Sequence, residues 1–596
     1  MEKRSTRVIL SLLLLICFTL AACGGNNIQS SQNTTQAAQD SQTTGSGGDG
    51  GSGDSGGSGS GSGDSGGSVG DSSSGDSGGS GSGSGDSSGS GSGSGNNAVQ
   101  TTAGSNDNID QSSGNNILRL RTDYDIQNLD PAFIVRWVDD TVDRAVMEGL
   151  IRYIPNSTET MNVLAEWMEV SEDGLEISFK LKEGIMWQRG YGELTTEDVK
   201  FSFERFQDPE LGAAYADDWA ALDHIEIIDK YQGKIVLSEP QVTLWTTTMP
   251  LTSGLIACKQ FYEDVGPEGF STDAVGTGPY LFEEWRPTER MVLKRNPDYW
   301  GEQPDWDEIH LIPIIDDTSA EVAFEAGELD FSLITLGSTD LFESNPRYNV
   351  MTIPTLSYGW VGLNMQNPKL QDINVRQAIR YAIDVPSILE AAYFGKAEQA
   401  RALLPPRVLG YWEDAPLYQR DVEKARGYMA QAGLTSLDLE IIIESTVEYR
   451  TWAEIIQQNL AEIGINLTIT PLDPSAFWVA GEGDKGLELE MFAIMFSAMA
   501  DPAWFTMWFT SDQVGVWNWM RWPSAEFDEL HRRGLSTTDP TERASIYIEM
   551  QKLWDEAAHT VWITHMPKTY AFMPNVSPVM DSNGTIPMVR DFKVIN

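Results

Sequence analysis

Apolar positions in the last four-fifths of the chain follow two spacings in turn. In TWAEIIQQNLAEI (residues 451–463) they fall three or four positions apart, which predicts a helix with one buried face. Gly464 follows, and INLTI (residues 465–469) then alternates apolar and polar side chains as a half-buried strand does. A helix, a glycine and a strand in this order are typical of a sheet with helices packed on it.

Capping residues mark further helices along the same region. Thr195 precedes an apolar helical pattern with Asp198 three positions later, which is a capping arrangement. A second helix is predicted after Asp372, and Asp384 with a following proline starts a third that Gly395 ends. No repeat of 20 to 50 residues is visible, which argues against a solenoid or a propeller. The fold class expected is therefore α/β.

The first 22 residues have the three-part pattern of a secretory signal peptide. Basic residues come first, an apolar run follows at residues 8–20, and two alanines precede Cys23. The run is short for a membrane-spanning helix, which is the alternative interpretation. Leu20-Ala21-Ala22-Cys23 resembles the lipobox of bacterial lipoproteins, and this resemblance implies cleavage before Cys23 and lipid attachment to its sulfur.

Residues 23–116 are expected to form a lipidated cysteine followed by a disordered linker. Residues 24–116 hold 28 of the 56 glycines and neither lysine, arginine, tryptophan nor phenylalanine. Such a segment cannot bury enough apolar surface to offset the entropy of ordering it. It would either keep a folded body close to a membrane or simply extend that body beyond the surrounding surface polymers. Both interpretations stay open.

Charge and cysteine content exclude several classes of protein. With 40 Lys+Arg against 87 Asp+Glu the net charge is −47, which disfavours nucleic-acid binding through a basic surface. Three cysteines are too few for a disulfide scaffold. Cys258, in the apolar sequence SGLIACKQF, is expected to be a small buried side chain rather than a nucleophile.

Common catalytic and metal-binding motifs are absent from residues 117–596. The sequence has no Gly-x-Ser-x-Gly, Ser-x-x-Lys, His-Glu-x-x-His or Gly-x-x-x-x-Gly-Lys. His559 and His565 lie near each other but lack an evident third metal ligand. We therefore expect no catalytic residue, no metal site and no cofactor, although a dispersed pair of carboxylates, as in a glycosidase, stays open.

Several stretches of residues 117–596 are informative when taken together. In chain order they are LDPAF (129–133), EGLI (148–151), LAEWMEVSEDGLEISFKLKEGIMW (164–187), LTTEDVKFSFERF (194–206), GTGPYLFEEW (276–285), LKRNPDYWG (293–301), AGELDFSLI (326–334), VGLNMQNPKLQDINVRQAIRYAIDVPSI (361–388) and DVEKARGYMAQAGL (421–434). In this order they resemble one family, the bacterial extracellular solute-binding proteins of family 5, which are receptors of ABC importers for peptides, oligosaccharides and nickel complexes.

The resemblance implies a two-lobed periplasmic-binding-protein fold of type II, with an extra subdomain in the first lobe. Lobe 1 is expected at residues 117–355 plus 566–596 and lobe 2 at residues 356–565. The segment 355–364 and the stretch near His565 would then cross between the lobes. The lobes would close on a ligand and so present a different shape to the transporter.

The sequence departs from the family pattern at one loop of lobe 2. Peptide receptors of the family carry an acidic residue three positions before an Asp-Pro pair, where it binds the α-ammonium group of the ligand. Here Ala498 stands at that position, so another carboxylate, such as Asp501, would have to supply the charge. The tryptophans that follow could instead stack on sugar rings.

The candidate ligand-binding residues lie in this loop, in the aromatic segment after it and at the expected crossover. Trp517 and Trp519 would face the same side if the segment is a strand. The alternative for each aromatic residue is a place in the core or in the hinge. The candidates are Tyr358, Trp360, Phe496, Ser497, Met499, Asp501, Trp504, Trp517, Asn518 and Trp519.

The function expected is an extracytoplasmic, lipid-anchored substrate-binding protein of an ABC importer, located in the periplasmic space or at the cell surface. It would capture an oligopeptide-like or oligosaccharide ligand between its lobes and deliver it to the membrane permease, as a monomer and without nucleic acid. Two alternatives stay open. Turnover of an oligosaccharide would indicate a surface glycoside hydrolase, and loss of sensing with intact uptake would indicate a receptor for a membrane sensor.

Overall fold

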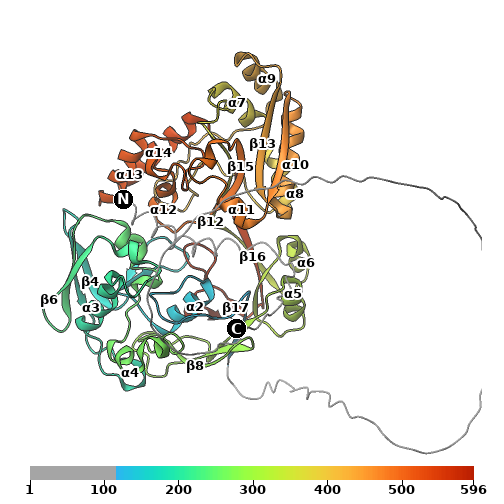
Figure 1. Cartoon of the computed structure of the whole chain (residues 1–596). Coiled ribbons are helices and arrows are strands. Elements are labelled where there is room, and N and C mark those ends of the chain that lie inside the picture. Colours follow the sequence, from blue (N-terminus) through green and yellow to red (C-terminus); the bar gives the residue numbers. More distant parts are fainter. Residues whose placement is uncertain (1–115, 596) are drawn as a thin grey trace, which may run out of the picture. The chain divides into compact units, whose positions relative to one another are not determined.

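Apolar strands assemble into one large mixed sheet in the computed structural model, which describes residues 116–595 (Figure 1). In this range ten strands follow the order β14-β13-β15-β12-β16-β11-β1-β10-β9-β8. The sheet is parallel at β14/β13/β15 and at β11/β1/β10, and antiparallel at its other pairs. Its strands are β1 (Ile117–Thr122), β8 (Tyr280–Arg286), β9 (Arg290–Arg295), β10 (Glu308–Pro313), β11 (Phe331–Ile334), β12 (Asn349–Leu363), β13 (Leu437–Glu444), β14 (Ile465–Leu472), β15 (Met491–Phe496) and β16 (Thr560–Phe572).

Helices cover this sheet, and the α/β prediction is confirmed. Figure 1 shows α7, α9 and α10 beside β13, and α5 and α6 beside the far end of β16. The helices are α2 (Trp137–Val146), α3 (Thr196–Glu204), α4 (Lys259–Phe270), α5 (Asp317–Glu325), α6 (Thr339–Glu343), α7 (Ile373–Ala382), α8 (Val385–Tyr393), α9 (Val422–Gln431), α10 (Val447–Ala461), α11 (Pro474–Trp478), α12 (Ala503–Thr506), α13 (Ala525–Ser536) and α14 (Pro540–Ala557).

The capping residues act as expected. Asp198 accepts a hydrogen bond from the Thr195 backbone N–H at 2.9 Å, and the two residues form a capping box before α3. Asp372 accepts from the first turn of α7, and Asp384 does so for α8. Helix α8 ends at Tyr393, two positions before Gly395, because Phe394 already has a left-handed φ of 54°.

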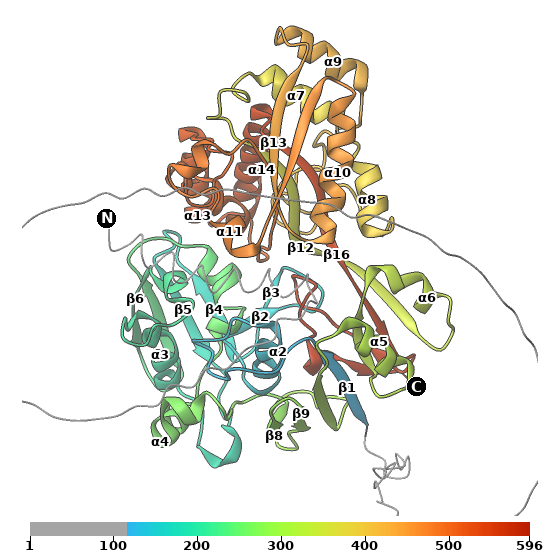
Figure 2. The same ribbon diagram turned by 45° about the vertical axis from the view of Figure 1, so that its right-hand side comes forward.

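The strands β12 and β16 connect the two groups of elements seen in Figure 2. They are 15 and 13 residues long and pair antiparallel, with register shifts between Pro354 and Tyr358 and between Gly359 and Trp360. The expected lobe boundaries near residues 355 and 566 fall inside these strands. The boundaries themselves stay a prediction.

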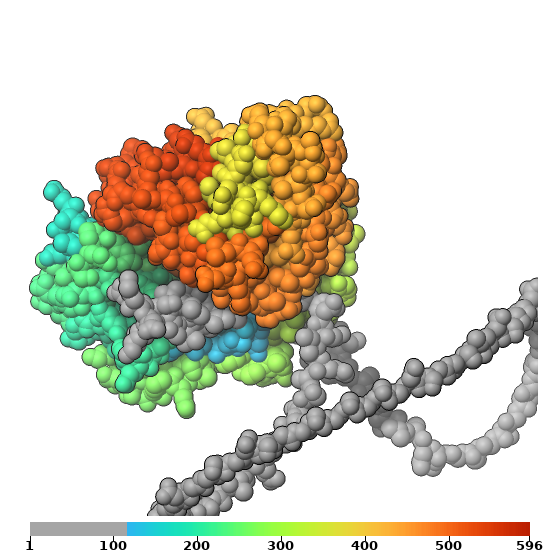
Figure 3. Space-filling model, turned by 45° about the horizontal axis from the view of Figure 1, so that its top comes forward, coloured from blue at the N-terminus to red at the C-terminus, as the bar shows by residue number. Residues whose placement is uncertain are grey.

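In the space-filling view, atoms of the yellow-to-red half of the chain gather together, with green and blue atoms beside them (Figure 3).

A second, antiparallel sheet lies among residues 165–237. Its order is β4-β5-β7-β6, and helix α3 packs against β6. The strands are β4 (Ala165–Val170), β5 (Glu176–Leu181), β6 (Leu222–Ile227) and β7 (Gln232–Leu237). Two short pairs complete the strands of the described range: β2 (Ile151–Tyr153) with β3 (Thr160–Asn162), and β17 (Val576–Ser577) with β18 (Lys593–Val594).

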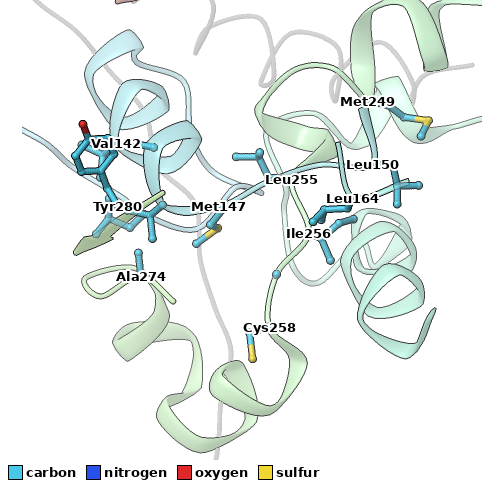
Figure 4. Packing of buried hydrophobic residues seen from close by; sticks show 14 of the residues in the cluster. Val142, Met147, Leu150, Leu164, Met249, Leu255, Ile256, Cys258, Ala274 and Tyr280 are labelled. Atoms are coloured by element: carbon cyan, nitrogen blue, oxygen red, sulfur yellow. The ribbon is translucent and has the colours of Figure 1, made fainter. Parts of the chain in front are cut away.

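Cys258 lies in the apolar core of this part of the chain, as predicted. It is completely buried with Met147, Leu255 and Ile256 in one cluster (Figure 4). Burial raises the pKa of its thiol to about 12, so the reactive thiolate is disfavoured at neutral pH. The predicted signal peptide, Cys23 and the linker up to residue 115 lie outside the described residues.

Candidate functional site

A cavity in the described part of the chain is lined by residues from many separate segments. Its lining includes Thr355 and Ser357 of β12 and Met566 and Lys568 of β16. Side chains from α2, from residues 251–253 and from residues 581–586 line it as well. Further side chains come from residues 123–124, 134–136 and 215–218. Others lie at the ends of β13 and β15 or in the segments that follow β13, β14 and β15. Residues that lie more than 400 positions apart in the sequence therefore contribute to one site.

Five aromatic side chains form a continuous part of the lining, which we call the aromatic wall: Trp478, Phe496, Trp504, Trp508 and Trp517. Ring centroids are 6.2 Å apart for Trp478 and Phe496, 6.0 Å for Phe496 and Trp517, 5.8 Å for Trp517 and Trp508, and 6.2 Å for Trp508 and Trp504. Rings at these spacings hold one another in place. They offer a ligand an apolar surface with fixed geometry.

Half of the residues predicted from sequence line the cavity. These are Phe496, Ser497, Met499, Trp504 and Trp517. The Ser497 hydroxyl lies 2.8 Å from the hydroxyl of Ser357 on β12. The structure does not bring the other five to the cavity wall, and each of them is buried: Tyr358, Trp360, Asp501, Asn518 and Trp519.

Asp501 has a structural partner and is not free to bind an ammonium group. Its carboxylate accepts two hydrogen bonds from the Arg543 guanidinium, at 2.6 and 2.7 Å, and one from the Thr246 hydroxyl at 2.6 Å. Burial alone would raise the pKa of Asp501, but Arg543 and Thr246 lower it below its ordinary value. The suggestion that Asp501 replaces the missing charge at Ala498 therefore finds no support in this geometry.

Tyr358 and Trp360 lie behind the aromatic wall. Their rings stack on each other at 5.2 Å, and Phe496 packs against both, at 6.2 and 5.0 Å. They are 0% and 1% exposed, so a ligand in the cavity meets Phe496 first. Their place is the core that supports the wall, which is the alternative considered from the sequence.

The prediction that Trp517 and Trp519 face the same side is wrong. Residues 517–519 form a turn rather than a strand, so the alternation of a strand does not apply. Trp519 packs on Phe477 and Phe492, with its indole N–H donating to the Val516 carbonyl at 3.0 Å. The Asn518 amide donates to three backbone carbonyls and so fixes this turn from the inside.

Several acidic side chains of the lining accept hydrogen bonds from neighbouring groups of the protein. Asp123 accepts from the Trp137 indole at 2.9 Å, and Asp140 accepts from Arg144 at 2.7 Å. Asp581 accepts from two backbone N–H groups, each at 3.0 Å. Each of these carboxylates thus already has hydrogen-bond partners within the protein, although burial still raises the pKa of Asp123 and Asp581.

Three other charged side chains of the lining form no salt bridge within residues 116–595: Arg136, Asp218 and Glu444. The Arg136 guanidinium lies 4.7 Å above the Tyr124 ring. Burial, with a smaller effect of Asp217, raises the pKa of Asp218 to about 7. Burial also raises the pKa of Glu444, although the Trp478 indole N–H lowers it to a smaller extent.

Trp478 and Glu444 are the functional candidates that sequence reasoning missed. Glu444 is the last residue of β13, and Trp478 belongs to the short helix directly after β14. Ligands of open α/β sheets bind beyond the carboxyl ends of the parallel strands. The one available signal was therefore a charged or aromatic residue directly after an apolar strand.

The family of the chain follows from comparison with known proteins. The family described as "Bacterial extracellular solute-binding proteins, family 5 Middle" matches residues 159–516, which is more than half of the chain. The chain belongs to this family, and the resemblance seen in the sequence is confirmed. Members of the family are transport receptors rather than enzymes, and the chain has a substrate-binding role in ABC transport.

Individual relatives cover most of the folded region. The glutathione-binding protein GsiB of Shigella dysenteriae is 27% identical over 440 residues, which is 70% of this chain and 84% of that protein. The dipeptide-binding protein of Escherichia coli K12 is 26% identical over 457 residues, covering 70% and 83%.

A solved structure supports the fold. HbpA2 from Haemophilus parasuis superposes with a TM-score of 0.75 at 24% identity, covering 81% of this chain and all of that one. At this identity the likeness concerns the fold alone. It confirms the predicted two-lobed fold of the family.

Two further features are absent from the described residues. No group of three or more His, Cys, Asp or Glu side chains between residues 116 and 595 is arranged to hold a metal ion. In the same range, no helix combines the length and apolar character that crossing a bilayer requires.

Proposed function

We propose that the chain captures a peptide in this cavity and delivers it to the permease of an ABC importer. The observation that carries the proposal is the presence in the lining of ionisable groups of both kinds without a salt-bridge partner: basic Arg136, and acidic Asp218 and Glu444, whose ionised forms an ammonium group would stabilise. A peptide brings an ammonium and a carboxylate group that can pair with them. A neutral oligosaccharide would leave the Arg136 guanidinium desolvated without a counter-charge, which is costly. The names of GsiB and of the dipeptide-binding protein point in the same direction.

A binding screen tests this proposal. Pools of di- to pentapeptides and a set of cello- and xylo-oligosaccharides are added to the full chain, and the melting temperature is measured. Hits are then titrated by calorimetry. We expect peptides to raise the melting temperature and oligosaccharides to leave it unchanged. A rise with oligosaccharides alone would overturn the peptide proposal.

An oligosaccharide is the second candidate ligand, because the aromatic wall favours it. Flat indole rings can stack on the apolar faces of sugars, and their N–H groups bind hydroxyls. The same screen decides between the two candidates. Product formation from a bound oligosaccharide would instead support a glycoside hydrolase.

We further propose that the mature chain begins at Cys23 and is held at the outer face of the membrane by lipid on that cysteine. The lobes would occupy residues 117–355 plus 566–596 and residues 356–565, and the protein would act as a monomer. The pattern of the first 23 residues supports the anchor. Cys23→Ser should release the protein into the medium or leave it unprocessed. Unchanged labelling by a fatty-acid probe would contradict the site.

A further inference from the structure

Residues at or after the ends of three parallel strands lie at one edge of the cavity. Strand β13 lies between β14 and β15 and runs parallel to both, so their carboxyl ends meet at the same edge of the sheet. Glu444 ends β13, helix α11 with Trp478 follows β14, and residues 497–499 follow β15. Figures 1 and 2 both show α11 at this end of the strands. Glu444, Trp478 and the loop after β15 all line the cavity.

The loop after β15 offers no available negative charge at this edge. Ser497, Ala498 and Met499 line the cavity with neutral side chains. Asp501, the nearest carboxylate in the loop, is 3% exposed and binds both guanidinium nitrogens of Arg543. A cationic ligand group at this edge must therefore find its counter-charge on another strand.

Glu444 is suited to supply that charge. It lines the cavity, is half-buried, and forms no salt bridge within the part of the chain that the structure describes. The neighbouring acidic side chain, Glu448, also lines the cavity and accepts a hydrogen bond from the Tyr393 hydroxyl. Glu444 thus keeps its hydrogen-bonding capacity for a ligand to a greater extent than Glu448 does.

The aromatic wall completes the site for a cation. Trp478 lies beside Glu444 and stacks with Phe496 at 6.2 Å, and its ring lies 6.3 Å from that of Trp517. The faces of indole rings attract cations, and the attraction is stronger in a desolvated site. A carboxylate next to such faces favours an ammonium group over a neutral one.

We infer that Glu444, together with Trp478, binds a primary ammonium group of the ligand at the carboxyl end of β13. The inference rests on the proposed peptide ligand and names the group through which the peptide is oriented. The ammonium group can be the peptide's N-terminus or a lysine side chain. Both present the same chemistry to the carboxylate.

The experiment compares three tripeptide pools on the full chain, with retained peptides measured by mass spectrometry. The first pool has free N-termini and no lysine or arginine, the second is the same pool N-acetylated, and the third is N-acetylated with one lysine. We expect retention of the first pool, the third or both, and loss of the second. Retention of the first indicates the terminal amine, and retention of the third indicates the side chain.

Variants then assign the site. Glu444→Gln should lower the affinity for a retained free-amine or lysine peptide roughly tenfold or more, because a charge-assisted hydrogen bond is lost. Glu444→Asp keeps the charge and should retain part of the affinity. Glu440→Gln, on the same strand but exposed and bonded to Thr470, is the matched control and should bind as the parent does. Circular dichroism verifies that each variant is folded.

Each outcome decides the inference. Equal retention of the second pool, or a loss on Asp218→Asn with none on Glu444→Gln, overturns the assignment to Glu444 while the peptide function stands. Retention of none of the three pools overturns the peptide proposal itself, and the inference with it.

Discussion

At the scale of single residues, Trp517 and Trp519 differ in surroundings although two positions separate them. Trp517 lines the cavity in the aromatic wall, whereas Trp519 is 1% exposed between Phe477 and Phe492. We expect Trp519→Ala to lower the free energy of unfolding by about 3 to 5 kcal/mol, the usual cost of emptying a large buried site. Trp517→Ala should destabilise the protein less than Trp519→Ala does, and it should weaken ligand binding more.

Urea unfolding and calorimetry with a peptide from the screen measure the two effects. Full affinity in the Trp517 variant would remove the aromatic wall from the binding site. A Trp519 variant as stable as the parent would contradict its place in the core.

Asp139 provides a residue-scale prediction about pH. It is 2% exposed, and burial raises its pKa to about 7 even though the Gln127 backbone N–H donates to it. The folded state therefore keeps a proton that the unfolded state loses near pH 4, so this group lowers stability as pH rises from about 4 to about 7. Asp139→Asn removes the charge and keeps an oxygen for Gln127.

The free energy of unfolding of the Asp139→Asn variant, relative to that of the parent, should increase as the pH rises from 4 to 8. Denaturant unfolding at both pH values measures it. A difference that stays constant with pH would show that Asp139 does not titrate in this range.

At the scale of elements, local patterns predicted much of the secondary structure. Thr195 with Asp198, Asp372 and Gly464 each act on neighbours within a few positions, so their effect can be read along the chain. The aromatic wall could only partly be predicted, because Trp478 and Phe496 meet through the neighbouring strands β14, β13 and β15. Strand neighbours are decided by tertiary packing, which spacing along one segment does not contain.

The contact between Asp501 and Arg543 joins the loop before α12 to helix α14, and both side chains are at most 2% exposed. Asp501→Asn would leave the guanidinium buried without its counter-charge. We expect a loss of about 3 to 5 kcal/mol in the free energy of unfolding. Asp484→Asn, at an exposed position, should change it by less than about 0.5 kcal/mol. Urea unfolding of both variants checks the difference, and equal stabilities would contradict the role assigned to the pair.

At the scale of the whole molecule, a ligand that binds the folded chain stabilises it by mass action. At one hundred times its dissociation constant the gain is about 2.7 kcal/mol. A peptide from the screen should therefore raise the urea midpoint in proportion to the logarithm of its concentration. The radius of gyration from X-ray scattering should fall on binding if the lobes close. A peptide that raises the urea midpoint but leaves the radius of gyration unchanged would contradict the closing mechanism.

The paired strands β12 and β16, which form a two-stranded ribbon, determine which distances within the cavity change when the lobes move. Thr355, Ser357 and Met566 belong to this ribbon, so their distances from a peptide lying on it would change little however wide the lobes stand. Arg136 and Glu444 come from elements on either side of the ribbon, so the gap between them would vary most. A peptide long enough to contact both side chains would thus set the distance between them, and its length would determine how far the lobes close.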